Sequence, residues 1–186
     1  MPDGNTIAAK YEAATGVPRM DKDEALKLAK RLAIEVPKIA TSFTNGAWTE
    51  AVYQSLTAFK QEKDWKIFPL EKCYLGEYHC DFMLFEDGYG CRLACESQWQ
   101  TFRSNADELK WAFDKLRGVK SDVKLLIFEG PDTWRDDIRE YLEGYSQLDP
   151  VETFVFMRWN HTLWELSWWK PTVAGIQTEA FSPIEF

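Results

Sequence analysis

The sequence contains no apolar run approaching the roughly 20 residues that a membrane-spanning helix needs. Its opening stretch, MPDGNTIAAKYEAATG, also lacks the apolar segment of a secretion signal, so we expect a cytoplasmic protein with no membrane partner. It contains neither an internal repeat nor a low-complexity segment. With 186 residues, 45% of them hydrophobic, the chain is predicted to fold as one domain, 1–186, with a loose start over residues 1–20.

The sequence also lacks the CxxC spacing that is typical of zinc sites and redox motifs. Its four cysteines are Cys73, Cys80, Cys91 and Cys95. Without a secretion signal, we expect reduced thiols that serve as small core residues. The alternative is a disulfide between Cys80 and Cys95, which could meet as diagonal neighbours on facing strands.

An excess of basic residues is missing as well. The chain has 22 Lys and Arg against 30 Asp and Glu, which gives a net charge of -8 and a pI near 4.9. This balance counts against a protein that coats nucleic acid nonspecifically. It leaves room for a local basic groove, and basic residues do gather around Lys27, around Lys63 and between Lys110 and Lys124. Solvated helix faces would explain the same clusters.

The stretch from Glu77 to Gln100, EYHCDFMLFEDGYGCRLACESQWQ, predicts two strands joined by the four-residue loop 87–90. The predicted pairs are Glu86–Cys91, Phe85–Arg92, Met83–Ala94, Asp81–Glu96 and His79–Gln98, all on one side of the pleat. The other side is mostly apolar and is expected to face the core. The first side becomes polar at its far end and is expected to open into a cleft. Because the carboxylates of Asp81 and Glu96 repel each other there, we expect a cation.

Hydrophobic periodicity predicts the elements around this hairpin. Helices are expected over residues 21–36, closed by Pro37; over 47–61; from a cap at Asn105 or Asp107 to about Arg117; and from Trp134 to Leu142. Strands are expected over 66–75, edged by Pro69, and over 122–129, 152–159 and 162–169. The buried strand 122–129 follows the hairpin through a helix, which indicates a crossover connection. These elements predict an α/β fold with a mixed central sheet flanked by helices.

This order of elements resembles the PD-(D/E)xK nuclease superfamily and its restriction-endonuclease-like fold, over roughly residues 47–169. The family signature is an acid on the second core strand and an acid, any residue and a lysine on the third, often with a glutamate from the first core helix. The matching positions here are Asp81, then Glu96-Ser97-Gln98, and Glu50. The resemblance implies a nuclease that acts on DNA, with Mg²⁺ (or Mn²⁺) held by Asp81 and Glu96. It also implies that the Ser97 carbonyl and Glu50 assist.

Phosphodiester hydrolysis gives independent reasons for these residue types, because Mg²⁺ prefers oxygen ligands and lowers the pKa of a bound water. Two positions depart from the family pattern: Cys80 rather than proline precedes Asp81, and Gln98 replaces the lysine. Glutamine can orient a water or a phosphate but supplies no positive charge. Lys110, from the helix that follows, is a candidate to supply it.

Other interpretations of the same residues remain open. The protein could be a catalytically inactive nuclease-fold module that binds nucleic acid or protein, or a metal-dependent hydrolase of small phosphate esters. Asp81 and Glu96 could be ordinary polar residues, Glu50 could favour a helix start, and His79 could be a strand histidine bonded to a neighbour. The nine tryptophans could stack on bases, although core packing explains most of them. Trp168 and Trp169 are expected to face opposite ways, and one exposed ring would favour a homodimer.

Overall fold

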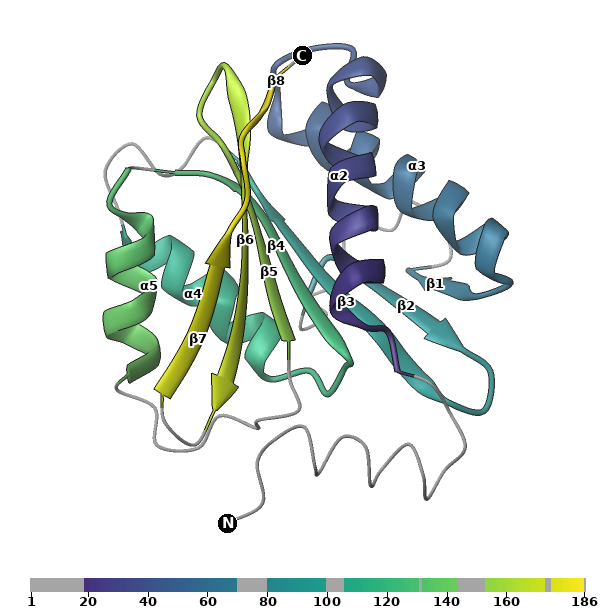
Figure 1. The fold of residues 1–186 in the computed structure, drawn as a ribbon. Coiled ribbons are helices and arrows are strands. Elements are labelled where there is room, and N and C mark those ends of the chain that lie inside the picture. The colour runs from purple at the N-terminus through teal and green to yellow at the C-terminus, as the bar shows by residue number, and fades with distance from the viewer. Residues whose placement is uncertain are drawn as a thin grey trace.

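The computed structural model describes residues 19–69, 80–99, 106–130, 132–143, 153–172 and 175–185, and these form three layers (Figure 1). The middle layer is an eight-stranded mixed sheet. Helices α2 (Lys22–Ile39) and α3 (Asn45–Lys63) cover one face, and α4 (Ala106–Arg117) and α5 (Trp134–Glu143) cover the other. The predicted α/β class with a mixed central sheet between helices is confirmed.

The strands are β1 (Lys66–Phe68), β2 (Phe82–Glu86), β3 (Gly90–Gln98), β4 (Val123–Glu129), β5 (Thr153–Trp159), β6 (Leu163–Thr172), β7 (Gly175–Ala180) and β8 (Ile184–Glu185). Strands β1 to β7 lie in the sheet in their sequence order, and β8 also pairs with β6. The pairs β3–β4 and β4–β5 are parallel, and the others are antiparallel. The predicted crossover from β3 through α4 to β4 is therefore confirmed.

Helix α2 shows how the sequence sets an element and where the prediction was wrong. The Asp21 carboxylate accepts from the Glu24 N–H at 2.8 Å, which caps the helix start. Its apolar stripe, including Leu28 and Leu32, is buried against the sheet. The helix was expected to stop before Pro37, but it continues to Ile39. A proline lacks the N–H donor and its ring crowds the carbonyl four residues earlier, but the ladder resumes at Ala40, whose N–H donates to the Val36 carbonyl.

Several other boundaries differ from the predictions. Strand β1 ends at Phe68, directly before Pro69, and residues 70–75 of the predicted strand lie outside the described residues. Helix α4 already includes Asp107, so Asp107 is a first-turn acid rather than the cap, and Asn105 is not described. Strands β7 and β8 were not predicted, because β7 is largely exposed and its sequence GIQTEA lacks an apolar alternation.

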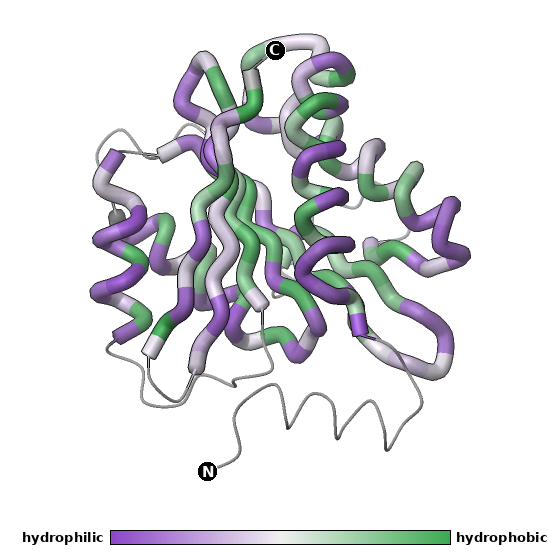
Figure 2. The backbone as a smooth tube through the Cα atoms, in the orientation of Figure 1, coloured by the Kyte–Doolittle hydropathy of each residue, from purple (hydrophilic) through white to green (hydrophobic). Residues whose placement is uncertain are grey.

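Each face of the sheet has its own hydrophobic core, and the neighbouring residues Trp168 and Trp169 belong to different cores. Trp168 belongs to the core beneath α2 and α3, whereas Trp169 packs with Trp134 of α5 on the opposite face. They face opposite ways as expected. Both are nevertheless buried, with 6% and 1% exposure, so the expected exposed ring is not found. Figure 2 shows the hydrophobic strands in the middle and polar stretches along the helices.

The described cysteines are free thiols, and Cys80 and Cys95 do not form the alternative disulfide. Burial raises the pKa of Cys80 and of Cys91 to about 12, so both are held as thiols. Cys73 lies outside the described residues. None of the described helices combines the length and apolar character needed to cross a membrane.

Candidate functional site

The β2–β3 hairpin has the predicted register at its open end and a different one at its turn. Phe82 pairs with Cys95 and Leu84 with Leu93, as expected. Beyond Leu84 the pairing shifts by one residue, so that the predicted pairs Phe85–Arg92 and Glu86–Cys91 are wrong. The observed pairs are Phe85–Cys91 and Glu86–Gly90. Arg92 is the extra residue of this β-bulge, because Leu93 pairs with Leu84 and Cys91 pairs with Phe85.

Asp81 and Glu96 meet at the open end of this hairpin, where they were expected to face each other. The Asp81 N–H donates to Oε2 of Glu96 at 3.0 Å. Oδ2 of Asp81 accepts from the Ser97 N–H at 2.8 Å and from the Ser97 hydroxyl at 2.9 Å. Because β2 begins only at Phe82, the Asp81 carboxylate satisfies a strand N–H for which β2 offers no carbonyl.

Glu96 is an almost fully buried acid, with 1% of the residue exposed. Burial raises its pKa to about 7, and the negative charge of Asp81 acts in the same direction. An ion pair with Lys115 of α4 acts against them. Burial and Asp81 together outweigh Lys115, so the Glu96 carboxyl group holds its proton to a higher pH than an exposed glutamate does.

Lys115 was missed by the sequence analysis, which named Lys110 instead. Lys110 turns away and lies over the ring of Tyr141, with Nζ 5.8 Å from the ring centroid. The available signal was position: Lys115 borders the buried stripe of α4 formed by Ala112 and Leu116, so its stem follows that stripe onto β3. Its ammonium group also lies over Trp111, 4.6 Å from the ring centroid.

The other two predicted site residues lie on the elements that carry the acids. Gln98 is half-buried and ends β3, two residues after Glu96 and therefore on the same side of the strand. Glu50 lies in α3 and accepts from Gln54 of the same helix at 2.8 Å. Thr49 of the same helix lies beside the site, with its Oγ1 3.3 Å from the Ser97 hydroxyl. His79 lies outside the described residues.

The pair Asp81 and Glu96 matches the ligands that Mg²⁺ prefers, although it is small. In the part of the chain that the structure describes, no three His, Cys, Asp or Glu residues are grouped closely enough to hold a metal. Mg²⁺, however, is commonly bound through one or two carboxylates, with waters and substrate phosphates completing its shell. Asp81 and Glu96 supply such carboxylates, and a cation beside them would relieve the repulsion that raises the pKa of Glu96.

Comparisons of the chain with protein-family models, with curated proteins and with solved structures find no match. A functional assignment therefore depends on the chemistry of the Asp81–Glu96 site itself.

Proposed function

We propose that the protein is a metal-dependent nuclease that hydrolyses phosphodiester bonds in DNA, with a restriction-endonuclease-like fold. The observation that carries this proposal is the juxtaposition of Asp81 with the buried Glu96, whose pKa is raised to about 7. The topology supports it: β2 is antiparallel to both neighbours, and β3, β4 and β5 run parallel. A helix precedes this sheet and another crosses from β3 to β4, in the order that the resemblance implies.

In this proposal Asp81 and Glu96 hold Mg²⁺ or Mn²⁺. When bound, the metal would lower the pKa of a water and neutralise charge on the phosphate. Because Glu96 binds a metal in its ionised form and has a pKa near 7, metal affinity should rise as the pH passes through 7. Gln98 lies on the same side of β3 and can orient a water or a phosphate oxygen through its amide.

Lys115 supplies the positive charge that Gln98 lacks. Its side chain is 21% exposed and forms an ion pair with Glu96, so the ammonium group has access both to the acid and to the surface. Trp111, which lies beneath that ammonium group, is 59% exposed. A lysine backed by an exposed ring suits the recognition of a phosphate and its neighbouring base.

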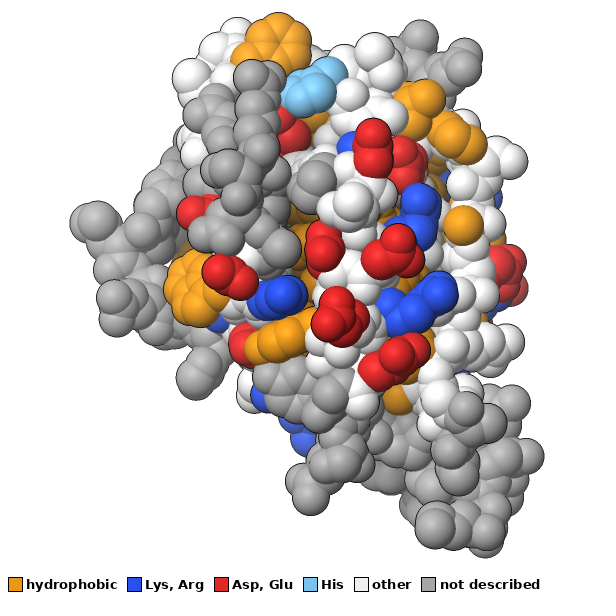
Figure 3. Space-filling model, turned by 90° about the vertical axis from the view of Figure 1, so that its left-hand side faces the viewer, with side chains coloured by type: hydrophobic (Ala, Val, Ile, Leu, Met, Phe, Trp, Pro, Cys, Tyr) orange, Lys and Arg blue, Asp and Glu red, His pale blue; other side chains and the backbone are white. Residues whose placement is uncertain are grey.

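The alternative is a nuclease-fold module that binds nucleic acid or protein without catalysis. One observation favours it: both acids already have partners within the protein, Glu96 in Lys115 and Asp81 in Ser97. The face shown in Figure 3 has acidic and basic side chains interleaved rather than a patch of one sign, which does not point to one type of partner.

Calorimetry and cleavage assays separate these functions. We expect Mg²⁺ or Mn²⁺ binding and cleavage of plasmid or oligonucleotide DNA. Asp81→Asn, which retains an acceptor for Ser97, and Glu96→Gln should each lower the cleavage rate by about a thousandfold. Asp87→Asn is the matched control, because Asp87 lies at the exposed turn of the same hairpin.

Three results would argue against DNA hydrolysis. Metal binding without cleavage of DNA or RNA supports the binding module. Cleavage of small phosphate esters alone supports a different hydrolase. If neither Asp81→Asn nor Glu96→Gln changes metal binding or cleavage, the acid pair is structural and the proposal is wrong.

A further inference from the structure

A pocket of about 450 Å³ lies on the side of the sheet that α3 covers. Its lining residues are Phe43, Thr44, Asn45, Trp48, Trp99, Glu129, Trp159 and His161. Glu129 and Trp159 end β4 and β5, and Trp99 directly follows β3. In α/β sheets with parallel strands, this carboxyl edge is where ligands usually bind, and the volume lies within the range of small-molecule sites.

Aromatic rings form one wall of the pocket. The Trp48 ring centroid lies 4.9 Å from that of Trp99 and 5.8 Å from that of Trp159. All three tryptophans are at least nine-tenths buried, so their rings are held in place by packing. Phe43 also lines the pocket, with its centroid 6.2 Å from Trp48, but is 82% exposed. A fixed wall and a solvent-facing ring offer aromatic faces on which a flat ligand can stack.

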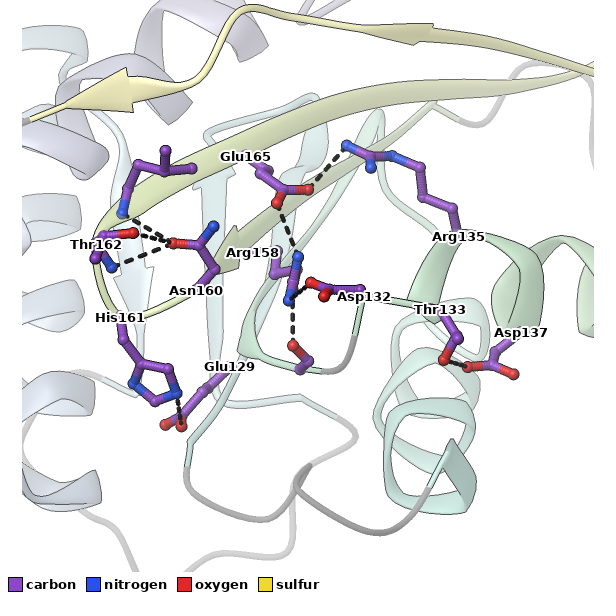
Figure 4. Close-up of polar contacts among 12 residues, drawn as sticks. Glu129, Asp132, Thr133, Arg135, Asp137, Arg158, Asn160, His161, Thr162 and Glu165 are labelled. Atoms are coloured by element: carbon purple, nitrogen blue, oxygen red, sulfur yellow. Dashed lines mark hydrogen bonds and ion pairs between the residues drawn. The ribbon is translucent and has the colours of Figure 1, made fainter.

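The polar part of the pocket is a carboxylate. Glu129 has a side chain that is 16% exposed, and its Oε1 lies 3.1 Å from Nε2 of His161 (Figure 4). His161 is the more exposed partner, with 55% of its side chain open to solvent. An ionised carboxylate only accepts hydrogen bonds, so a ligand that meets Glu129 must present donors.

We propose that this pocket binds a guanine base. Guanine is flat, and its N1–H and N2–H groups are adjacent donors that match the two oxygens of one carboxylate, with guanine taking the place of His161 at Oε1 of Glu129. Adenine, cytosine and thymine each place an acceptor beside their donor, which would meet Glu129 with repulsion. The aromatic wall supplies stacking, which any base would use, and Glu129 supplies the preference for guanine.

Strand β3 links the pocket to the acid pair. Ser97, which contacts Asp81, and Trp99, which lines the pocket, are two residues apart in the chain. That spacing corresponds to about 7 Å along an extended strand, or about two base steps of DNA. The inference thus deepens the proposed nuclease function, and its role beside a cleaved bond rests on that function. Base binding itself does not.

Neutral nucleosides test the pocket without a phosphate or a metal. Deoxyguanosine, deoxyadenosine, deoxycytidine and thymidine are titrated in EDTA, with tryptophan fluorescence and calorimetry as readouts. We expect deoxyguanosine to bind at least about tenfold more tightly than the other three. Glu129→Gln should remove most of that preference, and Phe43→Ala should weaken all stacking by about fivefold or more.

Ile34→Ala is the control, because Ile34 is an exposed apolar residue of α2 that does not line the pocket. Thermal melting checks that each variant is folded. Equal affinity for the four nucleosides, no binding, or a guanine preference that survives Glu129→Gln overturns the proposal. The proposal is also overturned if tetramethylammonium displaces deoxyguanosine and binds more tightly than it does. That result would identify an organic-cation site. Guanine binding without DNA cleavage would refute only the nuclease function, whereas cleavage without base binding would refute only the pocket.

Discussion

Two buried charged clusters, one around Arg158 and one around Glu96, have opposite electrostatic organisation. Arg158 of β5 is 5% exposed. Its Nε donates to the Gly130 carbonyl at 2.7 Å, and its two terminal nitrogens pair with Glu165 and Asp132 (Figure 4). Glu165 lies directly across the strand pair and also pairs with Arg135 at 3.1 Å. The buried cation thus has an acceptor at each of its nitrogens.

At Glu96 the buried group is an anion, and its surroundings are only partly favourable. A second carboxylate, Asp81, adjoins it, and Lys115 is the cation that offsets them. Burial and the charge of Asp81 outweigh Lys115, since the pKa of Glu96 is raised to about 7. The Arg158 cluster gains little from a further ligand, whereas the Glu96 cluster would be stabilised by a proton or a metal. Unrelieved charge of this kind is typical of functional sites.

Arg158→Leu should have the largest effect on stability. The substitution leaves the Gly130 carbonyl without its donor and removes one of the two cations that pair with Glu165. Breaking a buried charged cluster in this way should lower the free energy of unfolding by about 4 kcal/mol. Urea denaturation at pH 7 measures it.

Arg158→Lys is the control for that variant, because it keeps the charge but loses the planar fork. We expect an intermediate loss of stability. If Arg158→Leu lowers the free energy of unfolding by less than about 1 kcal/mol, the contacts of Arg158 do not contribute strongly to stability.

Glu96→Gln should change the pH dependence of stability. The pKa of Glu96 in the folded protein, about 7, lies above the ordinary value of 4.5, so the folded state binds more protons than the unfolded state between these pH values. The stability that the raised pKa of Glu96 contributes is complete below pH 4.5. It is lost as the pH rises through 7. From pH 4.5 to 8, the variant should gain up to about 3 kcal/mol relative to the wild type.

Lys115→Met sharpens the same measurement. Lys115 lowers the pKa of Glu96, so its removal should raise that pKa further and extend the loss of stability to higher pH. Unfolding free energies of the wild type and both variants across this range give the comparison. Parallel pH profiles for the wild type and Glu96→Gln would show that Glu96 titrates normally.

The sequence predicted the elements of the fold well because their apolar periodicity reflects burial. The apolar stripe of α4 and the apolar run of β4 can be read directly from the sequence. The pairing of Asp81 with Glu96 can be read in the same way, since strand residues alternate sides. The bulge at Arg92 could not be read from the sequence, because no letter marks the position at which one strand gains an extra residue.

The partners of the site were less predictable. Lys115 reaches Glu96 because α4 packs across β3, and the rotation of a helix on a sheet is a tertiary property. The contact of Thr49 with Ser97 likewise depends on how α3 is rotated on the sheet, since adjacent helical residues point about 100° apart. The pocket joins α3 to the ends of three strands, so spacing within one segment could not reveal it.

Asp87→Asn should have the smallest effect, although Asp87 belongs to the same hairpin as Asp81 and Glu96. Asp87 pairs with Lys66 at 2.7 Å, but their side chains are 76% and 65% exposed. Water and salt screen such a pair, so the loss in unfolding free energy should be under about 1 kcal/mol and should vanish at high salt. Urea denaturation at low and high salt measures it. A larger loss in unfolding free energy that persists at high salt would show that the exposed pair at the turn stabilises the hairpin strongly. It would contradict the contrast between this exposed pair and the buried acid.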